Sequence, residues 1–162
     1  MGQKSIIISI AVIIFAVIFA VLFILSRTQT ATNTRKTQKA DVAVIACGSL
    51  VHSAVLAAAE LEKDGISVKV INNASIKPMD KEVIVSAAKE AGAVVTVEEH
   101  QVAGGMGSAV AEILAKHHPV PIEFIGVQNR FGESGEPTEL IEHFGMGVKH
   151  IREAARKVMR RK

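Results

Sequence analysis

Short β-branched runs alternate with helical patterns from residue 41 onward, and this alternation restricts the fold more than any other feature of the chain. The runs that we interpret as strands are 41–46, 67–71, 93–98 and 121–127. The patterns that we interpret as helices are 50–63, 81–91, 108–117, 138–144 and 148–160. Such alternation predicts an α/β domain with a mainly parallel sheet covered by helices on both faces. Strands buried on both faces need not alternate in polarity, which agrees with these continuously apolar runs.

Turn residues mark several of the expected helix ends. Asp80 stands directly before the pattern at 81–91, where its carboxylate can accept hydrogen bonds from free backbone N–H groups. Gly92 stands where that helix should stop, and Asp64-Gly65 follows the helix at 50–63 in the same way. Residues 41–162 are therefore predicted to form one domain, with enough chain for one core and too little for two.

A very different segment precedes this domain. From Ile6 to Leu25 every residue except Ser9 is apolar. A helix of that length measures about 30 Å, the thickness of the hydrocarbon core of a bilayer. We therefore expect one N-terminal transmembrane helix in residues 1–25, spanning about 6–25. The alternatives are a cleavable signal peptide, whose apolar region is usually shorter, and a buried core helix, which this small domain could not surround.

Charges around this span predict its orientation. One basic residue precedes the span and four follow it before residue 40, which favours a single-pass membrane protein with a cytoplasmic C-terminal domain. The lone Cys47 agrees, because secreted domains of this size more often carry paired cysteines. Residues 26–40 are rich in Thr, Gln, Asn and Lys and are expected to form a flexible polar linker.

The basic character of the chain is unevenly distributed. Its formal charge is +3, but the first 39 residues hold five basic and no acidic side chains, so the remainder has a net charge of −2. With no Trp or Tyr and no general excess of basic residues, the domain is not expected to bind nucleic acid. The final helical pattern is itself basic with one apolar face. That helix could lie against anionic lipid or, as we prefer, dock on the domain.

The strongest candidate site is the end of the strand at 93–98. Glu98, Glu99 and His100 could form an acid–base group, since neighbouring carboxylates raise each other's pKa and histidine titrates near neutrality. The alternative, which we favour, is a solvated strand end that hydrogen-bonds to nearby loops, because no nucleophile or metal ligand set accompanies these residues. Cys47 follows the first strand and is interpreted as an inert buried thiol rather than a nucleophile.

The turn after this strand is rich in glycine. Gly104, Gly105 and Gly107 precede a helix whose free N–H groups could bind an anion. The spacing does not match a nucleotide-binding loop, so close packing of the strand against the helix is the preferred interpretation.

A second junction of this kind follows the strand at 121–127. Its candidate interface or ligand-facing residues are Arg130, Phe131, Gly132, Glu133 and Ser134. Arg130 and Glu133 could form an ion pair between domains, bind a substrate or remain solvated. The glycines and Pro137 around them favour an ordered loop, which indicates an interface.

Five motifs, in order, resemble the C-terminal domain of transketolase-type enzymes that depend on thiamine diphosphate. They are Ala46-Cys-Gly-Ser49, Val70-Ile71 with Ile76-Lys-Pro-Met-Asp80, Thr96-Val-Glu-Glu-His100, Gly104-Gly-Met-Gly-Ser-Ala-Val110, and Arg130-Phe-Gly-Glu-Ser-Gly-Glu-Pro137. The resemblance covers residues 40 to the end. It implies a three-layer α/β/α domain with a mostly parallel five-stranded sheet in which one strand runs antiparallel.

The departures from this family limit what the resemblance implies. Its members bind thiamine diphosphate and Mg²⁺ through a Gly-Asp-Gly motif in other domains, and these 162 residues contain no Gly-Asp-Gly. The family's third domain mainly packs on its neighbours and contributes to dimer contacts. We therefore assign no catalytic, cofactor-binding or metal-binding residue to this chain, and expect the cofactor and metal on a partner chain.

Two functions remain open from the sequence. The first is a membrane-tethered C-terminal module that assembles with a separate thiamine-diphosphate-binding chain, or as a homodimer, for ketol transfer between sugar phosphates in pentose phosphate metabolism. The second is a non-catalytic, membrane-localised interaction or ligand-sensing domain that kept the fold. Fold alone does not separate these hypotheses.

Overall fold

The computed structural model describes residues 39–162. The expected transmembrane span at 6–25 and nearly all of the expected linker at 26–40 lie outside the described residues. From residue 39 to residue 162, no helix is both long enough and apolar enough to cross a membrane.

Strands and helices alternate in the predicted order. The strands are β1 (Val42–Ala46), β2 (Val68–Asn72), β3 (Val94–Gln101) and β4 (Ile122–Val127). The helices are α2 (Leu50–Lys63), α3 (Lys81–Ala91), α4 (Met106–His117), α5 (Pro137–His143) and α6 (Val148–Met159). The Asp80 carboxylate accepts from the Val83 N–H at 3.0 Å and Gly92 ends α3 at φ 70°, as the turn residues predicted.

The sheet has the order β2-β1-β3-β4, and every pair of neighbours is parallel. The expectation of five strands, one of them antiparallel, is wrong for residues 39–162, where four strands form. After β4 the chain enters the polar, glycine-containing segment 128–136, which pairs with no strand, and the following two elements are helices. No apolar β-branched run is left to extend the sheet.

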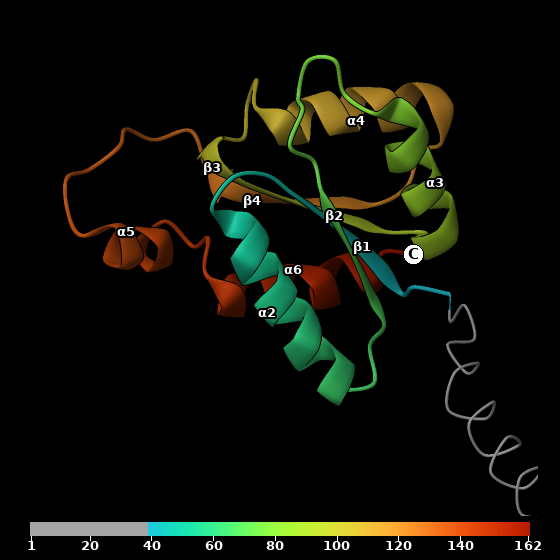
Figure 1. Ribbon diagram of the computed structural model, residues 1–162, viewed down its shortest axis with the longest axis horizontal. Coiled ribbons are helices and arrows are strands. Elements are labelled where there is room, and N and C mark those ends of the chain that lie inside the picture. Colours follow the sequence, from blue (N-terminus) through green and yellow to red (C-terminus); the bar gives the residue numbers. More distant parts are fainter. Residues whose placement is uncertain (1–38) are drawn as a thin grey trace, which may run out of the picture. The chain divides into compact units, whose positions relative to one another are not determined.

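Two helical layers enclose this sheet, as expected. Figure 1 shows α3 and α4 on one face and α2 and α6 on the other. Alternate residues of the central strands divide between the two cores: Val44 and Val95 pack with α2 and α6, whereas Ile45 and Val94 pack with α3 and α4. With both faces covered, the open positions lie at the ends of the strands.

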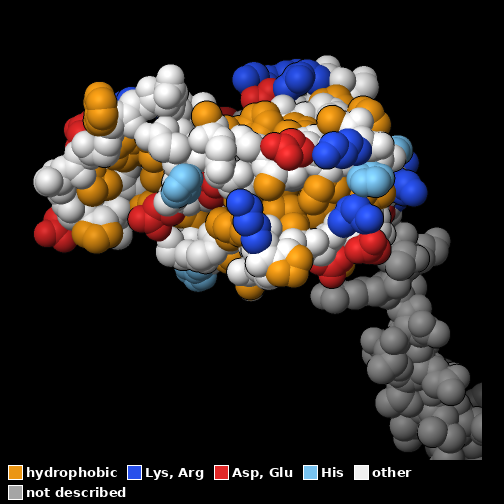
Figure 2. All heavy atoms as spheres, turned by 90° about the horizontal axis from the view of Figure 1, so that it is seen from above, with side chains coloured by type: hydrophobic (Ala, Val, Ile, Leu, Met, Phe, Trp, Pro, Cys, Tyr) orange, Lys and Arg blue, Asp and Glu red, His pale blue; other side chains and the backbone are white. Residues whose placement is uncertain are grey.

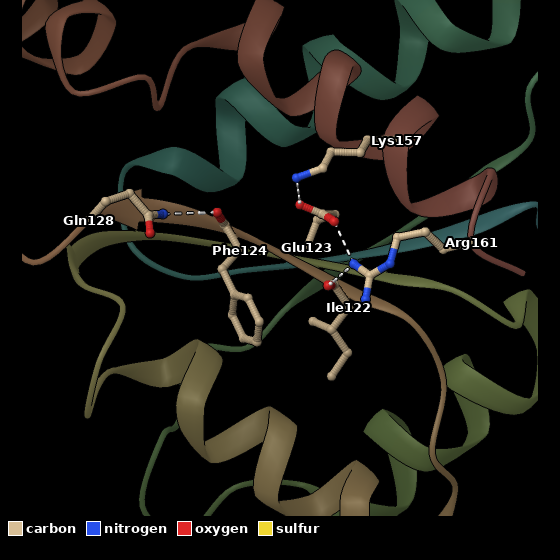
Figure 3. Close-up of polar contacts among 6 residues, drawn as sticks. All are labelled: Ile122, Glu123, Phe124, Gln128, Lys157 and Arg161. Atoms are coloured by element: carbon tan, nitrogen blue, oxygen red, sulfur yellow. Dashed lines mark hydrogen bonds and ion pairs between the residues drawn. The ribbon is translucent and has the colours of Figure 1, made fainter.

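Helix α6 docks on the domain, which confirms the preferred interpretation of the basic final pattern. It buries Ile151, Ala155 and Val158 in the core. Lys157 and Arg161 both reach Glu123 of β4, at 2.8 and 2.5 Å (Figure 3). Further basic residues of α6 pair with α2: Arg152 with Glu60 at 2.6 Å and Arg156 with Asp64 at 2.5 Å. Several of its basic side chains thus form ion pairs with acidic residues of the same domain.

Candidate functional site

The junction between β3 and α4 is built around Glu98. This side chain is 2% exposed, and its carboxylate accepts hydrogen bonds from the Met106 N–H at 2.6 Å and the Gly107 N–H at 2.8 Å. These are the first N–H groups of α4, which have no partner within the helix. The carboxylate therefore caps α4 and offsets its positive end. Glu98 is buried, which corrects the expectation of a solvated strand end at this residue, whereas Glu99 and His100 are exposed.

Glycines let the turn close over this carboxylate. A Cβ on Gly105 would overlap the Glu98 carboxylate and the Gln101 carbonyl oxygen. A Cβ on Gly107 would lie 2.6 Å from the Thr96 hydroxyl oxygen. The backbone of Gly104 has a φ of 82°, which residues other than glycine rarely adopt. The preferred interpretation of this motif as close strand-to-helix packing is confirmed.

This arrangement does not fit a diphosphate at the start of α4. The N–H groups that would bind a phosphate already donate to Glu98. An anion placed there would also meet a buried carboxylate of the same charge. No cluster of three or more His, Cys, Asp or Glu suited to a metal ion occurs within residues 39–162. The first N–H groups of α4 are therefore already used within the domain.

A hollow of about 330 Å³ opens beside this junction, at the carboxyl ends of β1 and β3. We call it the first hollow, and its lining is Cys47, Gly48, Ser49, Ile76, Glu98, Glu99, His100, Gly104, Gly105 and Met106. Five of the candidate residues from the sequence meet here, whereas Gly107 is buried and is not part of the lining. No Lys or Arg of the described chain lines it.

Glu98 and Glu99 point away from each other, so they do not form the acid–base pair considered above. Glu98 faces α4, while Glu99 is exposed and accepts a hydrogen bond from the Ser49 hydroxyl at 2.5 Å. The His100 Nδ1 lies 2.9 Å from the Gln101 carbonyl oxygen.

The Ser49–Glu99 pair borders a second hollow of about 450 Å³. Its lining is Ser49, Leu50, Ser53, Glu99, Pro137, Thr138, Ile141, Glu142, Gly147 and Val148. This second hollow also has an acidic and apolar lining without Lys or Arg among the described residues.

Cys47 is not poised as a nucleophile. Burial raises the pKa of its thiol, and the nearby Glu98 carboxylate raises that pKa further. The protonated thiol is the weakly reactive form. The interpretation of Cys47 as an inert thiol is therefore supported, but Cys47 is only partly buried and lines the first hollow, so the expectation of a buried thiol is wrong.

The remaining candidates lie on the loop between β4 and α5. The Arg130 carbonyl oxygen accepts from the Gln101 side-chain amide at 2.5 Å. The Arg130 guanidinium donates to the His143 carbonyl oxygen at 3.1 Å and stacks 4.2 Å from the centre of the Phe144 ring. The Glu133 carboxylate lies 3.0 Å from His143 Nε2. Arg130 and Glu133 thus hold the loop to α5 and to the end of β3.

Phe131, Gly132 and Ser134 occupy the exposed part of this loop. Phe131 is 96% exposed, although it is a large apolar side chain. The residues that sequence reasoning left out of the candidate set, Ser49 and Ile76, lie beside the first hollow. Their signal was their position shortly after β1 and β2, because the carboxyl ends of parallel strands share one edge of the sheet.

Another hollow, of about 400 Å³, lies away from these residues, on α3 and the end of α4. Its lining is Lys81, Glu82, Val85, Ser86, Lys89 and His117. It contains none of the candidate residues.

Known proteins share this domain. The chain is 45% identical over 122 residues to the 6-deoxy-6-sulfo-D-fructose transketolase subunit SqwH of Clostridium sp., covering 75% of this chain and 38% of that protein. It is 39% identical over 111 residues to an apulose-4-phosphate transketolase subunit from Phocaeicola vulgatus, covering 68% and 35%. It is 38% identical over 122 residues to the 1-deoxy-D-xylulose-5-phosphate synthase of Heliobacterium modesticaldum, covering 75% and 19%. The chain thus spans less than two fifths of the length of these relatives.

A solved structure agrees with these relatives. A protein described as a split gene transketolase, in an inactive beta4 tetramer, superposes with a TM-score of 0.72 at 42% identity, covering 76% of this chain and 40% of that one. The family described as transketolase, C-terminal domain, matches residues 32–151. This chain therefore belongs to the transketolase C-terminal domain family.

Proposed function

We propose that this chain is the C-terminal module of a split, thiamine-diphosphate-dependent transketolase. In this proposal a separate chain binds the cofactor and Mg²⁺, and the assembly transfers a two-carbon ketol unit between sugar phosphates. The observation that carries the proposal is the 42% identity, at a TM-score of 0.72, to a protein described as a split gene transketolase. Two relatives described as transketolase subunits, at 45% and 39% identity, support it.

The chemistry of the described residues supports a role in assembly rather than in the reaction. Glu98 is used to cap α4, Cys47 has a raised thiol pKa, and Glu99 accepts from Ser49. None of these groups forms a nucleophile–base pair in residues 39–162. The cofactor-binding and reacting groups are therefore assigned to the partner chain.

Membrane tethering is a further part of this proposal. It rests on the apolar run at 6–25 and on the basic residues that follow it. Alkaline carbonate extraction of native membranes tests it. The full chain should remain in the pellet, while a chain that begins at residue 39 should not. Release of the full chain by carbonate would refute the tether without affecting the assembly proposal.

Affinity purification of the tagged full chain from detergent-solubilised membranes tests the assembly. We expect a co-purifying chain that carries a Gly-Asp-Gly motif, and ketol transfer that needs both chains together. A purification that yields only unrelated proteins would contradict this function. It would favour a non-catalytic interaction domain that kept the fold.

A further inference from the structure

We propose that the carboxyl edge of the sheet is the surface on which the catalytic partner docks, and that the partner places a Lys or Arg side chain against Glu99. The carboxyl-edge surface comprises the first hollow, the second hollow and Phe131. This inference rests on the proposed function and adds to it the contact surface and its chemistry.

The apolar part of this surface has the character of a binding anchor. Phe131 is 96% exposed, and Ile76, at the first hollow, is 39% exposed. Aromatic side chains are enriched among the residues that dominate binding energy in protein interfaces. Because almost all of this phenyl ring is in contact with water, a partner that covers it would bury a large apolar area.

The loop that carries Phe131 is held in place before any partner arrives. Its neighbour Arg130 is fixed by the Gln101 amide, by the His143 carbonyl oxygen and by the Phe144 ring. Because fewer conformations must be lost on association, a loop held in this way binds more tightly than a mobile one.

Charge identifies the kind of partner. The exposed glutamates are Glu99, which borders both hollows, and Glu142 in the second, and no Lys or Arg of the described residues lines either hollow. Arg130, which is basic and nearby, is turned onto Phe144. In Figure 2 acidic side chains lie among hydrophobic ones toward the end that carries α5 in Figure 1, while Lys and Arg lie mainly in the middle and toward the opposite end, beside further acidic side chains.

A basic protein segment fits this surface better than the other occupants. A phosphate group would meet carboxylates, and the N–H groups of α4 that could bind it already donate to Glu98. A second copy joined symmetrically through the same surface would place like charges against each other, which opposes association. A partner that presents Lys or Arg satisfies both the exposed Glu99 carboxylate and the acidic hollows.

The test uses the full chain in detergent and, as its probe, the purified Gly-Asp-Gly-containing chain that co-purifies with it. Binding is measured by biolayer interferometry over a range of salt concentrations. Phe131→Ala and Glu99→Gln probe the carboxyl-edge surface. Val83→Ala and Glu82→Gln are matched controls on α3, where Val83 is 42% exposed and Glu82 has an exposed side chain that contacts Lys81 at 3.6 Å.

We expect Phe131→Ala to weaken partner binding about tenfold or more. Glu99→Gln should weaken binding about threefold and should flatten its dependence on salt, because one charge pair is lost. Both controls should stay within about twofold of the parent. All four chains should melt together with the parent, because each substituted side chain is exposed.

Three results would overturn the inference. If all four variants bind the partner as tightly as the parent chain does, the partner docks elsewhere on the domain, and the proposed function stays intact. If only Phe131→Ala weakens binding, and Glu99→Gln leaves the salt dependence of binding unchanged, then the partner places no basic side chain against Glu99. If the unmodified chain captures no Gly-Asp-Gly-containing chain, the proposed function fails and this inference fails with it.

Discussion

The junctions after β3 and after β4 both contain glycines at the carboxyl edge of the sheet, but one is closed and the other is exposed. After β3, the turn at Gly104 and Gly105 closes tightly over the buried Glu98 carboxylate. After β4, the loop at 128–136 is exposed and presents Phe131 to solvent. Glycine in the first junction makes room for a side chain of the domain, whereas Gly132 in the second has no atom within 4 Å of a Cβ built on it. Glycine-containing turns at the same sheet edge can therefore complete the core or remain exposed.

The charged side chains also differ between the two junctions. At the β3–α4 junction the Glu98 carboxylate accepts hydrogen bonds from two N–H groups of the domain itself. At the β4–α5 loop the acidic and basic side chains fasten the loop, through Glu133 to His143 and through Arg130 to Phe144, and leave the phenyl ring outside. We therefore regard the buried Glu98 of the first junction as the support, whereas the exposed Glu99 and the second junction belong to the proposed contact surface.

The largest expected effect is that of a side chain at Gly105. Gly105→Val should lower the free energy of unfolding by about 3 kcal/mol or more, because the new atoms would displace the Glu98 carboxylate from α4. Chemical denaturation followed by circular dichroism measures it. Gly132→Val at the open junction is the matched control and should change stability by less than about 0.5 kcal/mol. Equal effects at both positions would remove the distinction between the junctions.

A smaller effect is expected for the carboxylate itself. Glu98→Gln keeps the shape but turns one acceptor into a donor that faces the N–H of Met106 or Gly107. We expect it to cost about 1–3 kcal/mol of stability, while Glu99→Gln costs less than about 0.5 kcal/mol. Urea titrations of both variants make the comparison. If Glu99→Gln were as costly as Glu98→Gln, the exposed carboxylate would also be part of the structural support.

Acid titration compares this edge with the opposite end of β4. Desolvation opposes ionisation of Glu123, but its hydrogen bonds from Lys157 and Arg161 (Figure 3) outweigh that, so its pKa lies below the ordinary value. The unfolded chain then binds more protons at acidic pH. The stability that Glu123 contributes is present above about pH 4.3 and is lost as the pH falls through the folded-state pKa.

Glu123→Gln should therefore be less stable than the parent by about 1 kcal/mol at neutral pH, and the gap should close in acid. Unfolding free energies measured at intervals from pH 7 to about pH 3 make the comparison. A gap that does not change with pH would show that the charge of Glu123 is not what fastens α6 to β4.

The smallest effect on stability is expected at the exposed ring. Phe131→Ala removes a side chain that is 96% exposed, so the melting temperature should change by less than about 1 °C. Differential scanning calorimetry of the two chains measures this. A clear loss of stability would mean that Phe131 packs within the domain in solution, and the contrast between the junctions would then be weaker.

The order of the elements could be predicted from the sequence because apolar runs, caps and glycines agree along the chain. Helices α2 and α3 begin and end at the predicted residues, since Asp64-Gly65, Asp80 and Gly92 mark their ends. Helix α4 begins at Met106, two residues before the predicted start at Ser108, because Glu98 caps the extra residues from a distance of eight residues in the sequence. Local patterns do not contain such a contact.

For the same reason, the sequence predicted only part of the candidate site. The sequence placed Glu98, Glu99 and His100 at one strand end, but it did not show that Glu98 is buried and Glu99 exposed. That difference arises from the packing of α4 against β3. The expected fifth strand came from family resemblance alone and had no corresponding apolar run, and four strands form in residues 39–162.

Calorimetric titration of thiamine diphosphate with Mg²⁺ into the purified full chain, with and without the partner chain, tests the central claim most directly. That claim is that this chain supplies a docking module whose α4 terminus is closed by Glu98, while the cofactor site belongs to the partner. We predict no binding heat from the chain alone and cofactor binding when the partner is present. Micromolar binding by the chain alone would contradict the account.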